Sequence, residues 1–149
     1  MLSDRFPNAR LQLLGDGETM DEIRQYTARL RLEDRVCFAG SQSNVYPYLH
    51  EADLFVLPSD YEGMPMTVIE AMGTGLPIVA TRVGGVPDML TDGQSGLLTE
   101  CTAQSVYEAC ASLAADETLR QRLGLRAKQD CVRFSAQYMA QAYLEQYQK

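Results

Sequence analysis

Several patterns that mark common protein classes are missing from this sequence of 149 residues. It contains no run of 18 apolar residues, which excludes a membrane-spanning helix, and its first residues lack the apolar stretch of a secretion signal. The four cysteines form no Cys-x-x-Cys pair, and the single histidine, His50, can neither complete a zinc site nor join a nearby nucleophile. We therefore expect a cytoplasmic protein with reduced cysteines and no resident metal.

Positive charge is also scarce. The chain carries 20 acidic and 13 basic residues, giving a net charge of −7, and it has no basic cluster, so we expect no nucleic-acid partner. Between Arg35 and Arg120 the only cation is Arg82. A hydrophobic content of 46% is enough for a real core, and the length predicts one domain over residues 1–149.

Short apolar runs alternate with helical patterns over the first hundred residues. Strands are predicted at 11–14, 36–39, 54–57, 77–80 and 96–98, and helices at 20–30, 44–51, 66–72 and 87–90. Thr19 to Glu22 predicts a capping box, and the fully apolar run 54–57 is typical of a central strand buried on both faces. The alternation predicts an α/β fold, with a parallel sheet and helices on both faces. Beyond residue 101 the chain is expected to be helical, with caps at Asp116 and Ser135.

The densest functional signal is the segment 59–73. Glu62 lies in the loop after a buried strand, and Glu70 follows eight positions later, near the start of the next helix. Ligands bind at this edge of an open α/β sheet, and the start of a helix, here with Pro65, suits a phosphate. A carboxylate can accept two hydrogen bonds from a vicinal diol, so the pattern favours a sugar nucleotide. The alternative from spacing alone is two ordinary solvent-facing glutamates.

At these residues the sequence resembles the glycosyltransferases of the two-domain GT-B fold that are called glycosyl transferases group 1. The resemblance rests on a Glu-x7-Glu motif, Glu62 to Glu70, with the surrounding segments 52–59, 70–81, 84–88 and 92–98. It runs from about Ala9 to the C-terminus. It implies a Rossmann-like C-terminal domain that binds a nucleotide diphosphate sugar, the donor, for a retaining enzyme of glycan, polysaccharide or glycolipid biosynthesis. It also implies that no metal and no cofactor besides the donor substrate is needed.

The resemblance implies roles for individual residues. Glu70 would hold the ribose hydroxyls, and Glu62, the expected catalytic residue, would contact hydroxyls of the donor sugar. The backbone that meets the sugar and diphosphate would come from Gly63, Met64, Pro65, Met66 and Thr67. Gly40 and Ser41 would lie beside the base, with Arg82 as the only cation near the site.

Gly15 and Gly17 form the loop after the first expected strand, where the donor could make a further contact. An ordinary tight turn is the simpler interpretation of the two glycines.

Two parts that the resemblance leads one to expect are missing from the sequence. One is the N-terminal domain for the acceptor, and the other is an opening strand and helix whose Arg and Lys neutralise the diphosphate. Residues 1–7 look like the tail of that helix. We therefore expect the chain alone to be inactive, and to act with an N-terminal domain or partner chain, on an acceptor that a membrane could present.

The missing strand would lie between residues 11–14 and 54–57, so its absence should leave unpaired strand edges. Exposed side chains are also expected on the last helix, at Tyr138, Met139, Tyr143 and Tyr147. Together these features predict self-association and a low melting temperature.

Three other interpretations remain open. Asp60-x-Glu62 could bind Mg²⁺ or Mn²⁺ in a metal-dependent transferase. The chain could instead be a non-catalytic interaction module that completes or regulates a partner glycosyltransferase chain. Other enzymes of the GT-B fold, such as sugar-nucleotide epimerases, share the fold, but nothing in the sequence selects them.

Overall fold

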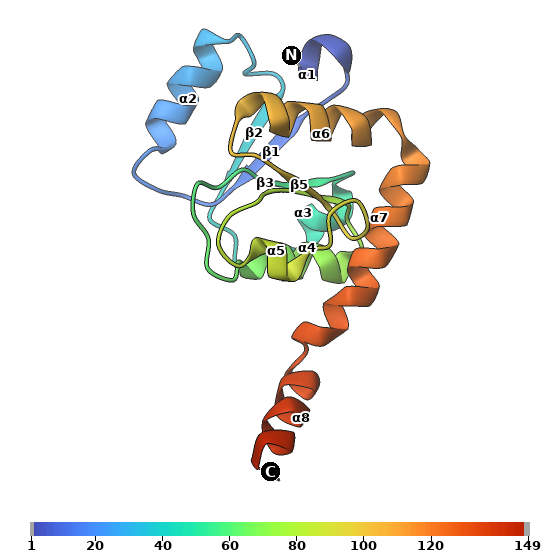
Figure 1. Ribbon diagram of the computed structural model, residues 1–149. Coiled ribbons are helices and arrows are strands. Elements are labelled where there is room, and N and C mark those ends of the chain that lie inside the picture. Colours follow the sequence, from blue (N-terminus) through green and yellow to red (C-terminus); the bar gives the residue numbers. More distant parts are fainter. Residues whose placement is uncertain (1, 148–149) are drawn as a thin grey trace. The chain divides into compact units, whose positions relative to one another are not determined.

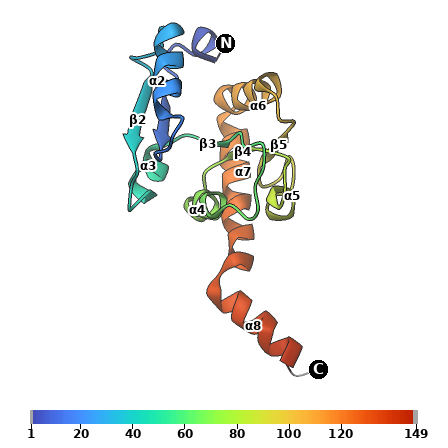
Figure 2. The same ribbon diagram turned by 90° about the vertical axis from the view of Figure 1, so that its left-hand side faces the viewer.

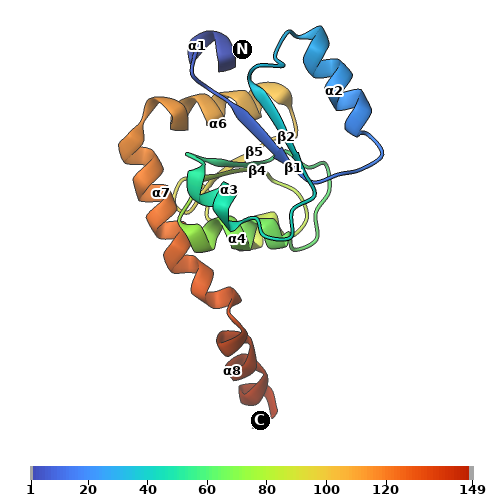
Figure 3. The ribbon, with the colours of Figure 1, turned by 180° about the vertical axis from the view of Figure 1, so that it is seen from behind.

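The computed structural model describes residues 2–147, and the chain divides into two compact units, Met1–Pro47 and Tyr48–Lys149. The first unit has two parallel strands, β1 and β2, which Figure 3 shows side by side. Its elements are α1 (Leu2–Arg5), β1 (Leu11–Leu14), α2 (Met20–Arg29) and β2 (Val36–Gly40). The helix expected near the N-terminus is present as α1. A single domain over residues 1–149 stays a prediction.

The first unit buries few side chains. The helix α2 lies against β2 through the Arg24 guanidinium, which stands 4.3 Å from the centre of the Phe38 ring. Within residues 2–47 the only buried side chain is that of Thr27, whose hydroxyl donates to the Ile23 carbonyl over 2.8 Å. The expected capping box was wrong: Thr19 does stand at the N-cap of α2, but its side chain accepts no hydrogen bond from the helix.

The second unit holds a three-stranded parallel sheet of order β3-β4-β5. Figures 1 and 2 show α6 on one face of this sheet and α4 and α5 on the other, which confirms the predicted α/β arrangement. The elements are α3 (Tyr46–Glu51, which starts just before the boundary), β3 (Phe55–Leu57), α4 (Met66–Thr74), β4 (Ile78–Thr81), α5 (Val86–Met89), β5 (Leu97–Thr99) and α6 (Ala103–Ala115). The central strand β4 is buried at every position.

The core of the second unit lies on both faces of β4. Its largest fully buried apolar side chains are Met72, Ile78, Met89, Leu113 and Leu123. The helices α4 and α7 (Glu117–Asp130) approach closely where α4 ends at Gly75, which has a left-handed φ of 83°. A Cβ on Gly124 of α7 would lie 2.0 Å from the Gly75 carbonyl oxygen, so only glycine fits there.

One prediction about the sheet was wrong. The apolar run at 54–57 was expected to form a central strand, but β3 stands at the edge of its sheet and is only half-buried. The reason is that β1 and β3 do not pair, so the parallel strands of the described residues form two separate sheets. Within the described residues, β1 and β3 each keep one edge without a partner strand. A further strand between them stays a prediction.

The chain ends in helices, as predicted. Asp116 caps α7 by accepting a hydrogen bond from the Leu119 amide over 2.9 Å, and Ser135 caps α8 (Ala136–Tyr147) through the Tyr138 amide. A 3₁₀ turn, η1 (Cys131–Phe134), joins the two helices, and α8 projects away from the sheet (Figure 1). More than half of each predicted α8 side chain is exposed: Tyr138, Met139, Tyr143 and Tyr147. Among residues 2–147 no helix has the length and hydropathy needed to cross a bilayer.

Candidate functional site

Three loops meet at the carboxyl edge of the β3-β4-β5 sheet, and all three follow directly from a strand. They are the loops 58–65, 82–85 and 100–102. Contacts between them are close: the Gly85 amide donates to the Gly63 carbonyl over 3.0 Å, and the Cys101 thiol donates to the Asp60 carboxylate over 2.7 Å. Glu62 of the predicted pair lies in the first of these loops, and Glu70 lies in α4, the helix that this loop leads into.

Glu62 is a half-buried carboxylate in the first of these loops. Its Oε1 atom accepts a hydrogen bond from the Ser59 hydroxyl over 2.7 Å. No other hydrogen bond or ion pair reaches this carboxylate from the described part of the chain, so Oε2 is free to accept one from a ligand. The hydroxyls of a sugar are suitable donors for it.

The start of α4 provides unpaired amides beside Glu62. Pro65 precedes the helix with extended backbone (φ −68°, ψ 115°), and no side chain caps this end. For the amides of Met66 and Thr67, residues 2–147 provide no acceptor. Two donors at the positive end of a nine-residue helix suit a phosphate oxygen.

Glu70 lies in α4, one helical turn after Met66. It is half-buried, and its carboxylate makes no hydrogen bond or ion pair with any described residue. Along the chain the two predicted glutamates thus lie before and after the open amides, and each has at least one oxygen available.

A groove of about 560 Å³ begins at the exposed methionines on either side of Pro65, Met64 and Met66. Its other lining residues are Ile69, Arg133, Phe134, Tyr138, Met139, Ala142, Tyr143 and Gln146. The expectation that Arg82 is the only cation near the donor site stays a prediction, and Arg133 is a cation beside this groove that sequence reasoning missed. No local pattern could have found it, because 67 positions separate Arg133 from Met66. Its guanidinium donates to the carbonyls of Asp88 and Met89.

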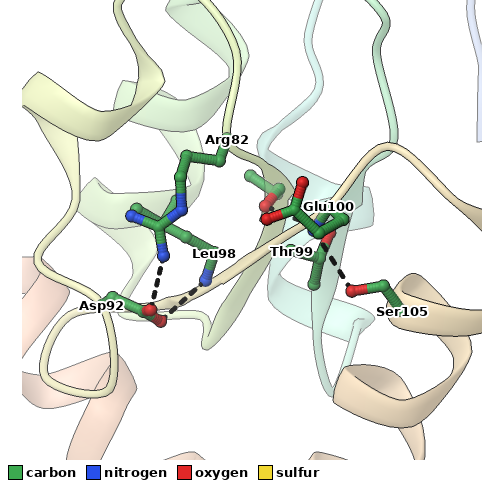
Figure 4. Close-up of polar contacts among 7 residues, drawn as sticks. Arg82, Asp92, Leu98, Thr99, Glu100 and Ser105 are labelled. Carbon is green, nitrogen blue, oxygen red and sulfur yellow. Dashed lines mark hydrogen bonds and ion pairs between the residues drawn. The ribbon is translucent and has the colours of Figure 1, made fainter.

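Arg82 forms an ion pair with Asp92 over 2.7 Å, and both side chains are about half exposed (Figure 4). The second carboxylate oxygen of Asp92 accepts from the Leu98 amide over 3.0 Å, so the pair ties the loop after β4 to β5. Figure 4 also shows the next contact along the edge, in which the Ser105 hydroxyl accepts from the Glu100 amide. Arg82 would have to leave Asp92 to meet a phosphate with its full charge, and an exposed pair of this kind is weak enough to allow that.

The predicted residues of the first unit lie at the carboxyl edge of β1 and β2. Gly15 and Gly40 have positive φ values of 120° and 68°, and the Gly15 amide donates to the Gly40 carbonyl over 2.8 Å. Gly17 has no positive φ, and its amide donates to Asp16. Ser41 follows Gly40 directly. The geometry supports the tight-turn interpretation of Gly15, and a contact of this edge with the donor stays a prediction.

The carboxylates of Asp60 and Glu62 have separate partners within the second unit. The hydrogen bond to Asp60 raises the pKa of the Cys101 thiol, with smaller contributions from burial and from the Asp60 charge. The thiol is therefore a stable donor at neutral pH, and Asp60 is held by Cys101 while Glu62 is held by Ser59.

Comparison with known proteins identifies one family, the glycosyltransferases. The family model described as glycosyl transferases group 1 matches residues 1–130. N-acetyl-alpha-D-glucosaminyl L-malate synthase of Bacillus anthracis is 35% identical over 142 residues, which are 95% of this chain and 36% of that protein. The lipopolysaccharide core biosynthesis glycosyltransferase LpsE of Rhizobium meliloti is 35% identical over 143 residues, 95% of this chain and 42% of its own length. The chain thus spans well under half the length of these relatives.

Solved structures share the fold. HepE of Anabaena in complex with UDP and glucose is 25% identical, with a TM-score of 0.90 over 99% of this chain and 42% of that one. HepE in complex with UDP-glucose is 27% identical, with a TM-score of 0.87 over 95% of this chain and 41% of its own. The C-terminal domain of LpcC from Francisella tularensis, at 21% identity and a TM-score of 0.79, shares the fold over 88% of this chain and 72% of that domain.

Proposed function

This chain belongs to the glycosyl transferases group 1 family, and on that premise we propose that it is the donor-binding half of a retaining glycosyltransferase. The enzyme transfers a sugar from a nucleotide diphosphate sugar to an acceptor in glycan, polysaccharide or glycolipid biosynthesis. One observation carries the proposal: Glu62 and Glu70 flank the uncapped start of α4 at the carboxyl edge of the sheet. The complexes of HepE with UDP and with UDP-glucose support the same class of ligand.

In this proposal each residue of the site contacts a different part of the nucleotide sugar. Glu70 accepts hydrogen bonds from the ribose hydroxyls, and Glu62 accepts them from hydroxyls of the donor sugar. The amides of Met66 and Thr67 donate to the diphosphate, and stabilise it as the leaving group when the bond to the sugar breaks. The donor is the only small molecule required, with no metal or further cofactor.

An N-terminal domain or a partner chain provides the binding site for the acceptor. It also provides the remaining cations that neutralise the diphosphate. The 149-residue chain alone is therefore expected to bind donor and to transfer no sugar. The competing proposal is a non-catalytic interaction module, and sugar transfer by a longer chain or a reconstituted pair would exclude it. A cytoplasmic location stays a prediction.

The decisive experiment is calorimetry of the chain with UDP and other nucleoside diphosphates. Glu70→Gln should weaken the binding of the tightest-binding nucleoside diphosphate by about 1.5–3 kcal/mol, the range for a hydrogen bond to a charged group. This corresponds to a rise in Kd of roughly 10- to 150-fold. The melting temperature should not change. Glu108→Gln, which alters an exposed glutamate of α6 bonded to Gln104, is the matched control. Equal affinity of Glu70→Gln and the parent chain would contradict the assignment of Glu70.

A further inference from the structure

The Glu62 carboxylate is connected to the core of the second unit by two hydroxyl groups. Thr81, the last residue of β4, donates from its hydroxyl to the Ser59 carbonyl over 2.5 Å. The Ser59 hydroxyl in turn donates to Glu62 Oε1 over 2.7 Å. Thr81 is 1% exposed, so the series of hydrogen bonds starts in the core and ends at the open edge of the sheet.

The strand register explains why Thr81 can reach Ser59. Leu57, the last residue of β3, pairs with Ala80 of β4, so Thr81 lies one position beyond the end of β3. The threonine hydroxyl has a single hydrogen to donate, and the Leu57 carbonyl, at 3.4 Å, is a much poorer acceptor than the Ser59 carbonyl. The Thr81 hydroxyl therefore donates its hydrogen to the loop 58–65, at the Ser59 carbonyl.

Two glycines, Gly84 and Gly85, also lie against the backbone of Glu62 and Gly63. A Cβ on Gly84 would lie 1.6 Å from the Glu62 carbonyl oxygen, and one on Gly85 would lie 2.3 Å from the Gly63 carbonyl oxygen. Both distances are shorter than any real contact, so the loop 82–85 lies directly on the loop 58–65. The backbone at Glu62 is thus fixed, and Ser59 controls the remaining freedom, which is that of the side chain.

We propose that Ser59 and Thr81 are positioning residues that hold the Glu62 carboxylate in its ligand-binding orientation, with Oε2 turned to a hydroxyl of the donor sugar. The inference rests on the proposed function, in which Glu62 contacts the sugar and Glu70 the ribose. A free glutamate side chain loses rotamer freedom when it binds, whereas one that is ordered in advance does not. Loss of the Ser59 hydroxyl should therefore weaken recognition of the sugar and spare recognition of the nucleotide.

The test compares UDP with UDP-glucose by calorimetry. Ser59→Ala should raise the Kd of UDP-glucose about tenfold, the value of one hydrogen bond, and change the Kd of UDP less than about twofold. Thr81→Val should act in the same direction with a smaller effect, and Thr81→Ser, which keeps the hydroxyl, should restore the parent affinity. Ser112→Ala and Thr74→Val are matched controls, because each removes a hydroxyl that donates to a helix carbonyl elsewhere in this unit.

A second measurement needs no ligand. Three-bond couplings in NMR spectra report the rotamer of Glu62, and we expect a single rotamer in the parent chain and averaged couplings in Ser59→Ala. If the parent chain binds neither UDP nor UDP-glucose, the proposed function fails. A single Glu62 rotamer in the parent chain with averaged couplings in Ser59→Ala would still support the positioning of Glu62. Averaged Glu62 couplings in the parent chain, or an equal loss of UDP and UDP-glucose affinity in Ser59→Ala, would overturn the inference.

Discussion

The two units of the chain contain similar elements but bury very different amounts of apolar surface. All the buried apolar side chains of the described residues belong to the second unit, beginning at Leu49. In the first unit the large apolar side chains remain a third or more exposed at Leu11, Leu14, Ile23, Tyr26 and Leu30. A parallel sheet normally has both faces covered, which the second unit achieves with α4, α5 and α6.

The difference shows what a strand pattern alone can and cannot do. The first unit has the predicted strands, a parallel pairing and an amphipathic helix, yet its two strands and the helices α1 and α2 supply too little surface to build a core. The first unit therefore has no apolar core of its own within the described residues. The self-association expected from the unpaired strand edges and from the last helix stays a prediction.

The largest expected contrast between the units is the cost of truncating a leucine. Leu113→Ala, at a fully buried position of α6, should lower the free energy of unfolding by about 2–5 kcal/mol, because it leaves a cavity. Leu30→Ala, at a position that is 50% exposed, should cost under about 1 kcal/mol. Urea unfolding of both variants measures the difference. If Leu30→Ala lowers the free energy of unfolding as much as Leu113→Ala does, Leu30 is buried in solution. If the effect of Leu30→Ala disappears when the protein is diluted, a second copy of the chain covers Leu30.

A smaller contrast concerns glycine. Gly124→Ala should destabilise the second unit by about 1–3 kcal/mol, although alanine normally favours a helix interior, because its Cβ would collide with the Gly75 carbonyl. Gly17→Ala in the first unit should be neutral or slightly stabilising, since Gly17 has no positive φ and open space around it. Thermal melts of the two variants suffice. A stabilised Gly124→Ala variant would show that α4 and α7 are further apart than described.

Most of the strands and helices, and the family, could be predicted from the sequence. Short apolar runs, three of which end before glycine or proline, predicted the strands, and a Glu-x7-Glu spacing in its full surroundings predicted the family. The capped helix starts at Asp116 and Ser135 followed from single residues. These features are local, or they depend on one long and specific motif.

The features that were missed depend on residues far apart in the chain. The edge position of β3 depends on which strands pair, and Arg133 reaches the groove beside Met66 only through the path of α7. Ser59 and Thr81 carry no periodic signal, since a single hydroxyl looks the same in a solvated loop and in a hydrogen-bonded series. Two adjacent glycines are typical of a turn, whereas the structure requires Gly84 and Gly85 for close contact with the backbone of Glu62 and Gly63.

The smallest contrast tests a helix cap in each unit. Asp116→Ala removes the acceptor for the Leu119 amide at the start of α7 and should cost about 1 kcal/mol, whereas Asp116→Asn should keep most of the stability. Thr19→Ala at the start of α2 should cost only a few tenths of a kcal/mol, because the Thr19 side chain accepts no hydrogen bond from the helix. Urea midpoints, together with hydrogen exchange of the first amides of each helix, measure both effects. If Thr19→Ala costs as much as Asp116→Ala, the capping box predicted from Thr19 and Glu22 forms in solution, and the first unit is better ordered than its exposed side chains indicate.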